Sequence, residues 1–277
     1  RGVPSGFKDL DNKLSGFQKS DLIILAARPS VGKTSLALDF ARNAAVKYGI
    51  PTAIFSLEMS KEQLVDRMLS AQSQVDGWKL RTSRLSLDEE FARLQQGMHE
   101  LMQAPIYVDD KAANTILNMR STLRRLNTER PIGLIIVDYL QLMGTSRQYD
   151  NMVNQVTEIS RSLKALAKEF NAPVIALSQL SRAVESRGGK PRLSDLRDSG
   201  SIEQDADVVM FIHREDKYGE NTDRKNIVEI LIEKHRNGPT GMVELYFDDK
   251  KTSFVSVEKS EFGDFSMPNV NVNMPDF

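Results

Sequence analysis

The chain has 277 residues and a formal net charge of −1, with 40% hydrophobic residues, 27% charged residues, no cysteine and no apolar run of membrane-spanning length. These values are typical of one large globular α/β unit, and they exclude disulfides, a cysteine nucleophile and a cysteine-built zinc site. The near-neutral charge excludes a protein that coats nucleic acid with a wholly basic face, so any nucleic-acid site must be local. The N-terminal residues lack a signal-peptide core, and we expect a cytoplasmic protein.

The first informative pattern is a predicted strand, loop and helix near the N-terminus. The apolar run Leu22–Ala26 predicts a buried strand, the residues that follow read ARPSVGKT, and an amphipathic helix continues to about Tyr48. In such a P-loop, backbone N–H groups and the positive end of the helix converge on phosphates. The lysine reaches the β- and γ-phosphates and the following hydroxyl coordinates Mg²⁺. The usual leading glycine is replaced here by alanine, which fits if its φ is negative. The sequence predicts a nucleoside triphosphate site formed by Ala27, Arg28, Pro29, Ser30, Val31, Gly32, Lys33, Thr34 and Ser35.

The elements that follow alternate between strands and helices. Apolar runs predict strands, and 3.6-residue periodicity predicts helices, one of them capped by Ser60. Uninterrupted apolar strands between helices favour a mostly parallel sheet that is covered on both faces. The predicted strands are residues 52–57, 106–109, 134–138 and 174–177, and the predicted helices begin at residue 61 and cover 116–127 and 153–170.

The second half of the chain changes this rhythm. Residues 208–213, 227–233 and 242–247 read as strands without intervening helices, which predicts an antiparallel extension of the sheet. We expect one α/β domain over residues 1–259 and a disordered tail over 260–277. Polar residues 75–104 read as a helical insertion that either offers a surface to a partner or serves packing alone.

Three polar residues at predicted strand ends are candidates for chemistry on the phosphates. Asp138 ends the strand LIIVD, and because ligands gather at the carboxyl ends of parallel strands, it is placed to hold Mg²⁺ with Thr34. Glu58 can act as a general base on the attacking water, or it is an acid favoured at a helix N-terminus. Gln179 either senses the γ-phosphate or is an ordinary strand-end residue.

A segment rich in basic residues and glycine follows Gln179. Local positive charge on such a backbone suits contacts with nucleic-acid phosphates that read no base sequence. The alternative is a solvated surface loop. The basic residues are Arg182, Arg187, Lys190, Arg192 and Arg197.

A predicted hairpin near the end of the chain carries two further cations. Lys234 and Arg236 alternate along a strand end and therefore point the same way. They suit fingers that reach the γ-phosphate held by a neighbouring subunit. An ordinary charged hairpin is the alternative.

Taken together, these segments resemble one family. Through ARPSVGKT, FSLEMS, LIIVDYLQLM, IALSQLSR, LRDSGSIEQDADVV and EKHRNGPTG, in this order, the chain is similar to bacterial replicative DNA helicases of the DnaB type over about residues 3–257. The resemblance implies a RecA-like P-loop NTPase fold that uses ATP and Mg²⁺. It also implies a hexameric ring around single-stranded DNA that unwinds duplex at the replication fork, with primase and a helicase loader as further partners.

The resemblance assigns a role to each candidate residue. Lys33 and Thr34 bind phosphate and Mg²⁺, Glu58 is the catalytic base and Asp138 is the Walker B acid. Gln179 is the γ-phosphate sensor. The remaining roles are fingers acting in trans for Lys234 and Arg236, and contact with the DNA backbone for Arg197, Asp198 and Gly200.

Other functions share the same phosphate loop. One alternative is a recombination or repair ATPase of the RecA type, which forms filaments on single-stranded DNA. An aromatic DNA-binding loop would indicate such a protein, and this sequence lacks one. Loss of the catalytic carboxylate would indicate a scaffold that binds ATP without turnover, but Glu58 is present. A P-loop kinase needs an arginine-rich lid and a substrate pocket, and neither is evident. We therefore predict the helicase motor.

Overall fold

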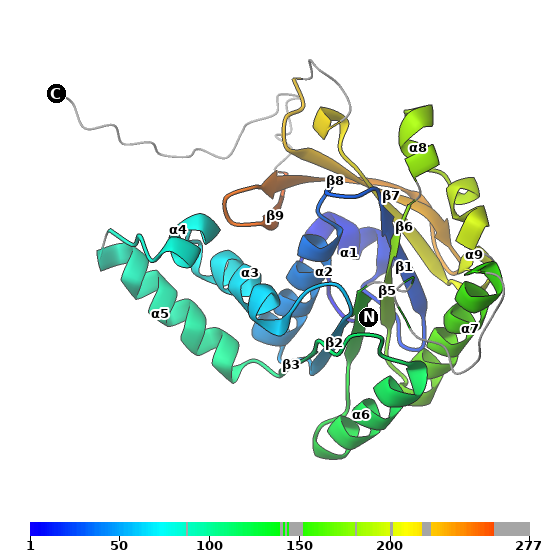
Figure 1. Ribbon diagram of the computed structural model, residues 1–277, viewed down its shortest axis with the longest axis horizontal. Helices are drawn as coiled ribbons and strands as arrows, with labels where there is room; N and C mark the ends of the chain where they lie inside the picture. The colour runs from blue at the N-terminus through cyan, green and yellow to red at the C-terminus, as the bar shows by residue number, and fades with distance from the viewer. Residues whose placement is uncertain are drawn as a thin grey trace.

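A computed structural model places one mixed sheet at the centre of the molecule (Figure 1). It describes residues 1–86, 88–138, 141, 143, 152–180, 182–199, 202–217 and 223–257, without the side chains of 152, 182, 183, 185 and 197–199. Nine strands within these residues follow the order β3-β2-β4-β5-β1-β6-β7-β8-β9. Their bounds are β1 Leu22–Ala27, β2 Thr52–Ser56, β3 Ile106–Asp109, β4 Leu134–Asp138, β5 Val174–Gln179, β6 Val208–His213, β7 Ile227–His235, β8 Gly241–Asp248 and β9 Ser253–Ser256.

The sheet is parallel from β3 to β6 and antiparallel from β6 to β9, which confirms the predicted fold class. The antiparallel part begins only after β6, because β6 itself runs parallel to β1 with Ile23 opposite Val208. β9 lies beyond the last strand that the sequence predicts. It pairs with β8 and closes the far edge of the sheet.

Two separate hydrophobic cores lie on the two faces of the sheet. Along β1, Ile23 and Leu25 pack into one core, while Leu22 and Ile24 pack into the other. This alternation follows from the two-residue period of a strand. Every residue of β1 is buried, as an uninterrupted apolar run in a doubly covered sheet requires.

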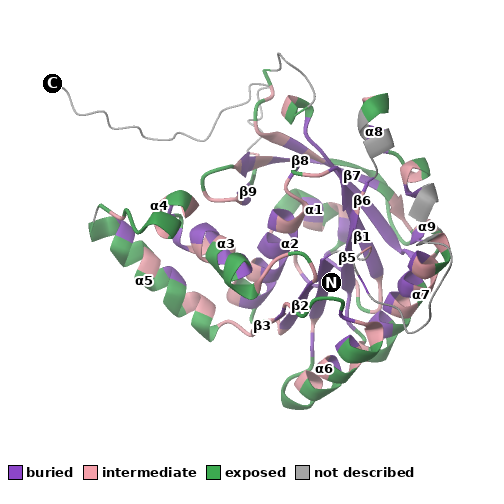
Figure 2. Ribbon diagram, viewed as in Figure 1, coloured by how far each residue is buried: buried purple, intermediate pink, exposed green. Residues whose placement is uncertain are grey.

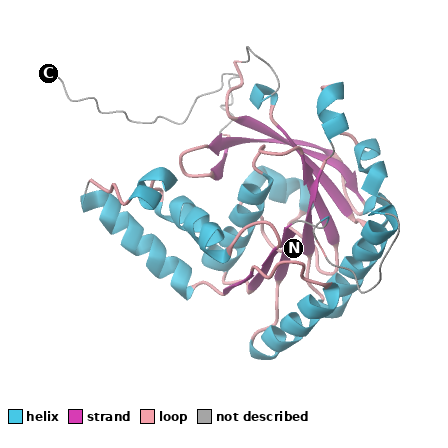
Figure 3. Cartoon of the chain, viewed as in Figure 1, coloured by secondary structure: helices cyan, strands magenta, loops and turns pink. Residues whose placement is uncertain are grey.

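Helices cover both faces in three layers (Figure 3). On one face lie α1 Lys8–Leu14, α2 Lys33–Arg42 and α3 Lys61–Ser73, whose buried side chains belong to the first core. The second core is covered by α6 Ile116–Glu129, α7 Met152–Phe170 and α9 Ile202–Asp205. Shorter turns are η3 Leu193–Ser199 and η4 Glu215–Lys217, and α8 Arg182–Arg187 follows β5.

Most predicted helices and strands match the structure within one or two residues, with two differences. Residues 8–14, where no helix is predicted, form α1, because Leu10 and Leu14 bury against the first core. The helix after the P-loop changes to π-helix over η1 Asn43–Lys47, where buried Asn43 donates a hydrogen bond to the carbonyl of Ser5. The predicted disordered tail over 260–277 lies outside the described residues.

The polar insertion forms two helices, α4 Gly77–Thr82 and α5 Asp88–Gln103. α5 packs against α3 at Gly97, where a Cβ atom would lie 3.0 Å from Cβ of Ser73. Its outer face is largely exposed (Figure 2) and carries Phe91, Met98 and Met102. Among the helices described, none combines the length and apolarity needed to cross a bilayer.

Candidate nucleotide-binding and catalytic site

The predicted site residues meet at one edge of the sheet. β2, β4, β5 and β1 are neighbours and parallel, so their carboxyl ends lie side by side. β1 ends at the P-loop, β4 ends at Asp138 and β5 ends at Gln179, while Glu58 lies two residues beyond β2. The structure thus brings together, from four strands, groups that are far apart in the sequence.

The backbone conformation of the P-loop explains why alanine stands at position 27 and glycine at position 32. Ala27 is the last residue of β1 and stays in its ladder, opposite Gln179 on one side and Ile212 on the other. An extended strand residue has negative φ, which explains why alanine replaces glycine here. Gly32 has φ +104° directly before α2, and a Cβ atom there would lie 2.9 Å from Cζ of Phe254. Only glycine fits this position without strain.

Lys33, Thr34 and Asp138 form the charged centre of the site. The Thr34 hydroxyl donates to Oδ2 of Asp138 at 2.8 Å, and Nζ of Lys33 lies 4.0 Å from Oδ1 of the same carboxylate. Burial lowers the pKa of Lys33, an effect that the carboxylates of Asp138 and Glu58 oppose. Burial also raises the pKa of Asp138, partly offset by Lys33 and by the hydrogen bond from Thr34. Both charged groups are therefore incompletely solvated. A bound polyphosphate would compensate the charge of Lys33, and a bound cation would compensate that of Asp138.

The residues present fit Mg²⁺. Oδ1 of Asp138 is buried without a hydrogen-bond partner among the described atoms, and the Thr34 oxygen lies against the same carboxylate. Carboxylate and hydroxyl oxygens are the hard ligands that Mg²⁺ prefers, and it usually takes only one or two from the protein. Thr34 and Asp138 would hold the ion.

A cleft of about 260 Å³ opens beside these groups. Glu58 and Gln179 line it together with Lys33 and Thr34, so the predicted base and sensor face the predicted phosphate site. Arg67 also lines the cleft, and its guanidinium donates to the Ser35 hydroxyl at 3.4 Å.

Arg67 is a site residue that the sequence prediction missed. Burial lowers its pKa, against the opposing effect of the carboxylates of Asp138 and Glu58. It lies on α3, where Gln63, Arg67 and Ser70 share one face at spacings of four and three residues. That spacing was the available indication, but it becomes meaningful only when α3 is known to border the P-loop.

Arg28 lines the cleft but faces away from the phosphate position. Its guanidinium is buried and donates to the carbonyls of Val184 and Gly189, each at 2.9 Å. These two carbonyls belong to α8 and to the glycine pair that follows it. Arg28 therefore joins the P-loop to the basic segment after β5.

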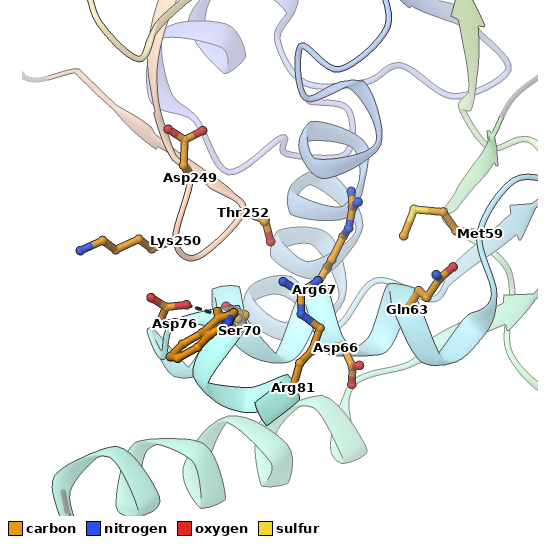
Figure 4. Close-up of a pocket in the computed structure, with 12 residues that line it drawn as sticks. Met59, Gln63, Asp66, Arg67, Ser70, Asp76, Arg81, Asp249, Lys250 and Thr252 are labelled. Atoms are coloured by element: carbon orange, nitrogen blue, oxygen red, sulfur yellow. Dashed lines mark hydrogen bonds between the residues drawn. The ribbon is translucent and has the colours of Figure 1, made fainter. Parts of the chain in front are cut away.

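A second, larger cavity of about 440 Å³ adjoins the cleft and shares Met59 and Arg67 with it (Figure 4). Asp249, Lys250 and Thr252 also line it, and Figure 4 shows them on the turn between β8 and β9, opposite α3 and α4. Its other walls carry charged and polar side chains and the half-exposed Trp78. Oγ1 of Thr252 is buried there without a hydrogen-bond partner among the described atoms.

Lys234 and Arg236 lie at the opposite end of the sheet from the P-loop. His235 pairs with Val208, and Val208 pairs with Ile23 near the start of β1, whereas the P-loop follows its last residue. Both cations point toward α9, as their alternation predicts. Lys234 donates to the carbonyl of Glu203 at 2.6 Å, and Arg236 donates to that of Gln204 at 3.3 Å. Neither side chain reaches the phosphate site of its own chain.

The predicted DNA contacts lie mainly outside the described part of the chain. Arg197 and Asp198 fall in η3 without described side chains, and Gly200 is not described. Elsewhere in the basic segment, charge is partly compensated. Arg187 is paired with Asp195 at 2.6 Å, and Lys190 is paired with Glu229 at 3.0 Å.

The chain is similar to known proteins in both sequence and fold. The chain is 52% identical over 260 residues to the replicative DNA helicase DnaB of Geobacillus stearothermophilus. The aligned region covers 93% of this chain and 57% of that protein. The chain is 50% identical over 269 residues to the replicative DNA helicase DnaC of Bacillus subtilis, covering 96% and 59%. The chain therefore spans less than two thirds of the length of these relatives.

Solved structures show the same similarity. A DnaB-like replicative helicase, described together with its interactions with primase, superimposes with a TM-score of 0.89 at 38% identity, over 93% of this chain and 62% of that one. A solved ATPase domain gives the same TM-score and identity and is covered over 92% of its length. The model of the DnaB-like helicase C terminal domain matches residues 2–256. The chain belongs to the DnaB-like helicase C-terminal domain family.

Proposed function

We propose that this chain is the ATP-driven motor of a replicative DNA helicase, with residues 1–259 as the motor domain. One observation carries the proposal: four adjacent strand ends bring a P-loop lysine and threonine, a glutamate and a glutamine to a single cleft of about 260 Å³, with the Asp138 carboxylate in contact with the threonine. Family membership favours this reading over a recombination ATPase that forms filaments.

The phosphates of ATP occupy the cleft in this proposal. Lys33 and Arg67 supply positive charge, and the backbone N–H groups before α2 complete an anion site at a helix N-terminus. When bound, Mg²⁺ neutralises charge on the β- and γ-phosphate oxygens. Base and ribose extend past Arg67 into the second cavity, toward Trp78 and Thr252.

Glu58 and Gln179 act on the γ-phosphate. Glu58 accepts a proton from the water that attacks phosphorus, so the phosphorus–oxygen bond to ADP breaks as the new bond to water forms. Gln179, which lines the same cleft, donates a hydrogen bond to the γ-phosphate while that group is present. When hydrolysis removes the γ-phosphate, the loss of this hydrogen bond is transmitted to the basic segment that follows β5.

Catalysis is completed by another copy of the chain. Lys234 and Arg236 lie at the opposite end of the sheet from their own P-loop, so in a ring they face the cleft of a neighbour. There they stabilise the negative charge that develops in the transition state. We propose a cytoplasmic hexamer around single-stranded DNA, with Arg197, Asp198 and Gly200 at the strand and with primase and a loader as further partners.

The test is the ATPase rate per chain across a range of protein concentrations, with and without single-stranded DNA. We expect the rate to climb steeply with concentration and to rise again with DNA. The Lys33→Ala variant serves as the control that assigns the activity to this cleft. A rate that is independent of both concentration and DNA would refute catalysis at a subunit interface.

A further inference from the structure

One side chain joins the two strand ends that carry the predicted Mg²⁺ ligand and the predicted sensor. β4 pairs with β5 only as far as Val137 opposite Ala176. β5 continues to Gln179 and keeps its partner β1 on the other side. Among the described residues, β5 therefore has no paired strand beyond Ala176 on the β4 side.

The backbone of Gln179 faces this open side. In a parallel ladder, successive residues direct their N–H and C=O groups to opposite neighbours. Leu180 donates its N–H to the carbonyl of Ala27 on β1, at 2.9 Å. The N–H and C=O of Gln179 consequently point away from β1, toward the position that β4 has vacated.

Gln141, three residues after Asp138, occupies that position. Its Oε1 accepts the N–H of Gln179 at 3.3 Å, and its Nε2 donates to the carbonyl of Gln179 at 3.2 Å and to the Ser178 hydroxyl at 2.8 Å. A flipped amide would set donor against donor and acceptor against acceptor, so these contacts fix its orientation. The side-chain amide replaces the missing peptide group of β4.

This contact bears directly on the sensor. Gln179 is half-buried, and its side chain lines the phosphate cleft. A side chain leaves its strand in a direction set by the backbone, so holding the N–H and C=O of Gln179 on the open side fixes where its amide can reach. Within the described part of the chain, the contacts that hold the Gln179 backbone from the β4 side all come from Gln141.

We propose that Gln141 is a positioning residue for ATP hydrolysis, which sets the Gln179 side chain against the γ-phosphate by acting as an added rung of the sheet. The proposal rests on the proposed function, since it concerns the same cleft. Gln141 makes no contact with ATP in this scheme. It acts through Gln179.

The experiment measures kcat, KM and the equilibrium affinity for ADP in Gln141→Ala, at a concentration where the unsubstituted chain is fully active. We expect kcat to fall between about tenfold and a hundredfold, as misplacement of a positioned group does. The affinity for ADP, which lacks the γ-phosphate, stays within about twofold. Gln141→Glu has the same size but sets a carboxylate against the Gln179 carbonyl, and we expect it to be as slow as Gln141→Ala.

The matched control is Gln155→Ala. Gln155 donates from α7 to the carbonyl of Met143 at 3.3 Å, close in sequence to Gln141, without any recorded contact with β5. Loss of this hydrogen bond should leave kcat unchanged. Should Gln141→Ala fail to fold, Gln141→Glu carries the test.

A double variant decides whether Gln141 acts through Gln179. If it does, Gln141→Ala combined with Gln179→Ala hydrolyses ATP no more slowly than Gln179→Ala alone. Multiplying effects, or a parental kcat in Gln141→Ala, would overturn the proposal and leave the proposed function intact. An unsubstituted chain without ATPase activity would overturn both.

Discussion

The carboxylate of Asp39 allows a sharp test of how the P-loop helix is held in place. Asp39 lies on α2 and is almost fully buried, and it accepts hydrogen bonds from the Phe254 N–H at 2.6 Å and the Ser253 hydroxyl at 3.2 Å. Arg42 lies 3.3 Å from it. Burial raises the pKa of Asp39 to about 6 from its ordinary 3.8, because desolvation outweighs these favourable contacts.

The direction of this shift determines the effect of pH on stability. A carboxyl whose pKa is raised in the folded state binds its proton more tightly there, so protonation stabilises the fold. The contribution is fully present below the unfolded value of 3.8 and is lost as pH rises through about 6. Between pH 7.5 and pH 5 the two pKa values correspond to a gain on the order of 1 kcal/mol in the free energy of unfolding.

The assay is urea unfolding of the parent chain and of Asp39→Asn at both pH values. The difference in unfolding free energy between parent and variant should shift by on the order of 1 kcal/mol in favour of the parent at pH 5. Glu129→Gln, an exposed carboxylate at the end of α6, should show no such shift against the parent. A shift of the opposite sign would mean that the hydrogen bonds from β9 outweigh burial, and the reasoning would fail.

Four further outcomes follow from the site. Lys33→Ala should abolish ATP hydrolysis, measured as phosphate release, because it removes the cation at the phosphates; undiminished turnover would rule the cleft out. Arg236→Ala should slow hydrolysis on the order of a hundredfold while leaving ADP binding intact, and weaker binding by the isolated monomer would exclude a role in trans. Gly32→Ala should lower the free energy of unfolding by about 1–3 kcal/mol, since φ +104° suits only glycine, and a stability equal to the parent's would contradict the described loop. Trp78 is the only tryptophan, so its fluorescence should change on ADP binding but not on tripolyphosphate binding; an equal response to both would place the nucleoside elsewhere.

The buried sheet and the phosphate site were predictable from sequence for the same reason. Uninterrupted apolar runs of strand length, such as residues 134–138, favour strands covered on both faces, and the carboxyl ends of parallel strands lie at a common edge. Asp138 and Gln179 could therefore be placed beside the P-loop before the structure was known. Both lie where expected, and Asp138 contacts Thr34.

Residues whose role depends on distant contacts could not be found in this way. Arg67 belongs to the cleft because α3 borders α2, and local periodicity does not contain that information. Gln141 matters because β4 ends before β5, and strand lengths differ by one or two residues from any sequence-based boundary. α1 was missed because turn residues flank a helix that is held by its burial in the core.

Because of its sheet, each copy of the chain behaves as a rigid body. The P-loop follows the end of β1, whereas Lys234 and Arg236, the proposed fingers, lie level with its start two strands away, so about 20 Å of strand length separates them at the rise of a strand. Hydrogen-bonded strands with a core on each face do not bend appreciably. In an assembly of the proposed kind, a shift at one nucleotide is therefore carried undiminished through the subunit to the next nucleotide along the ring. The hinges of such a machine lie between its subunits.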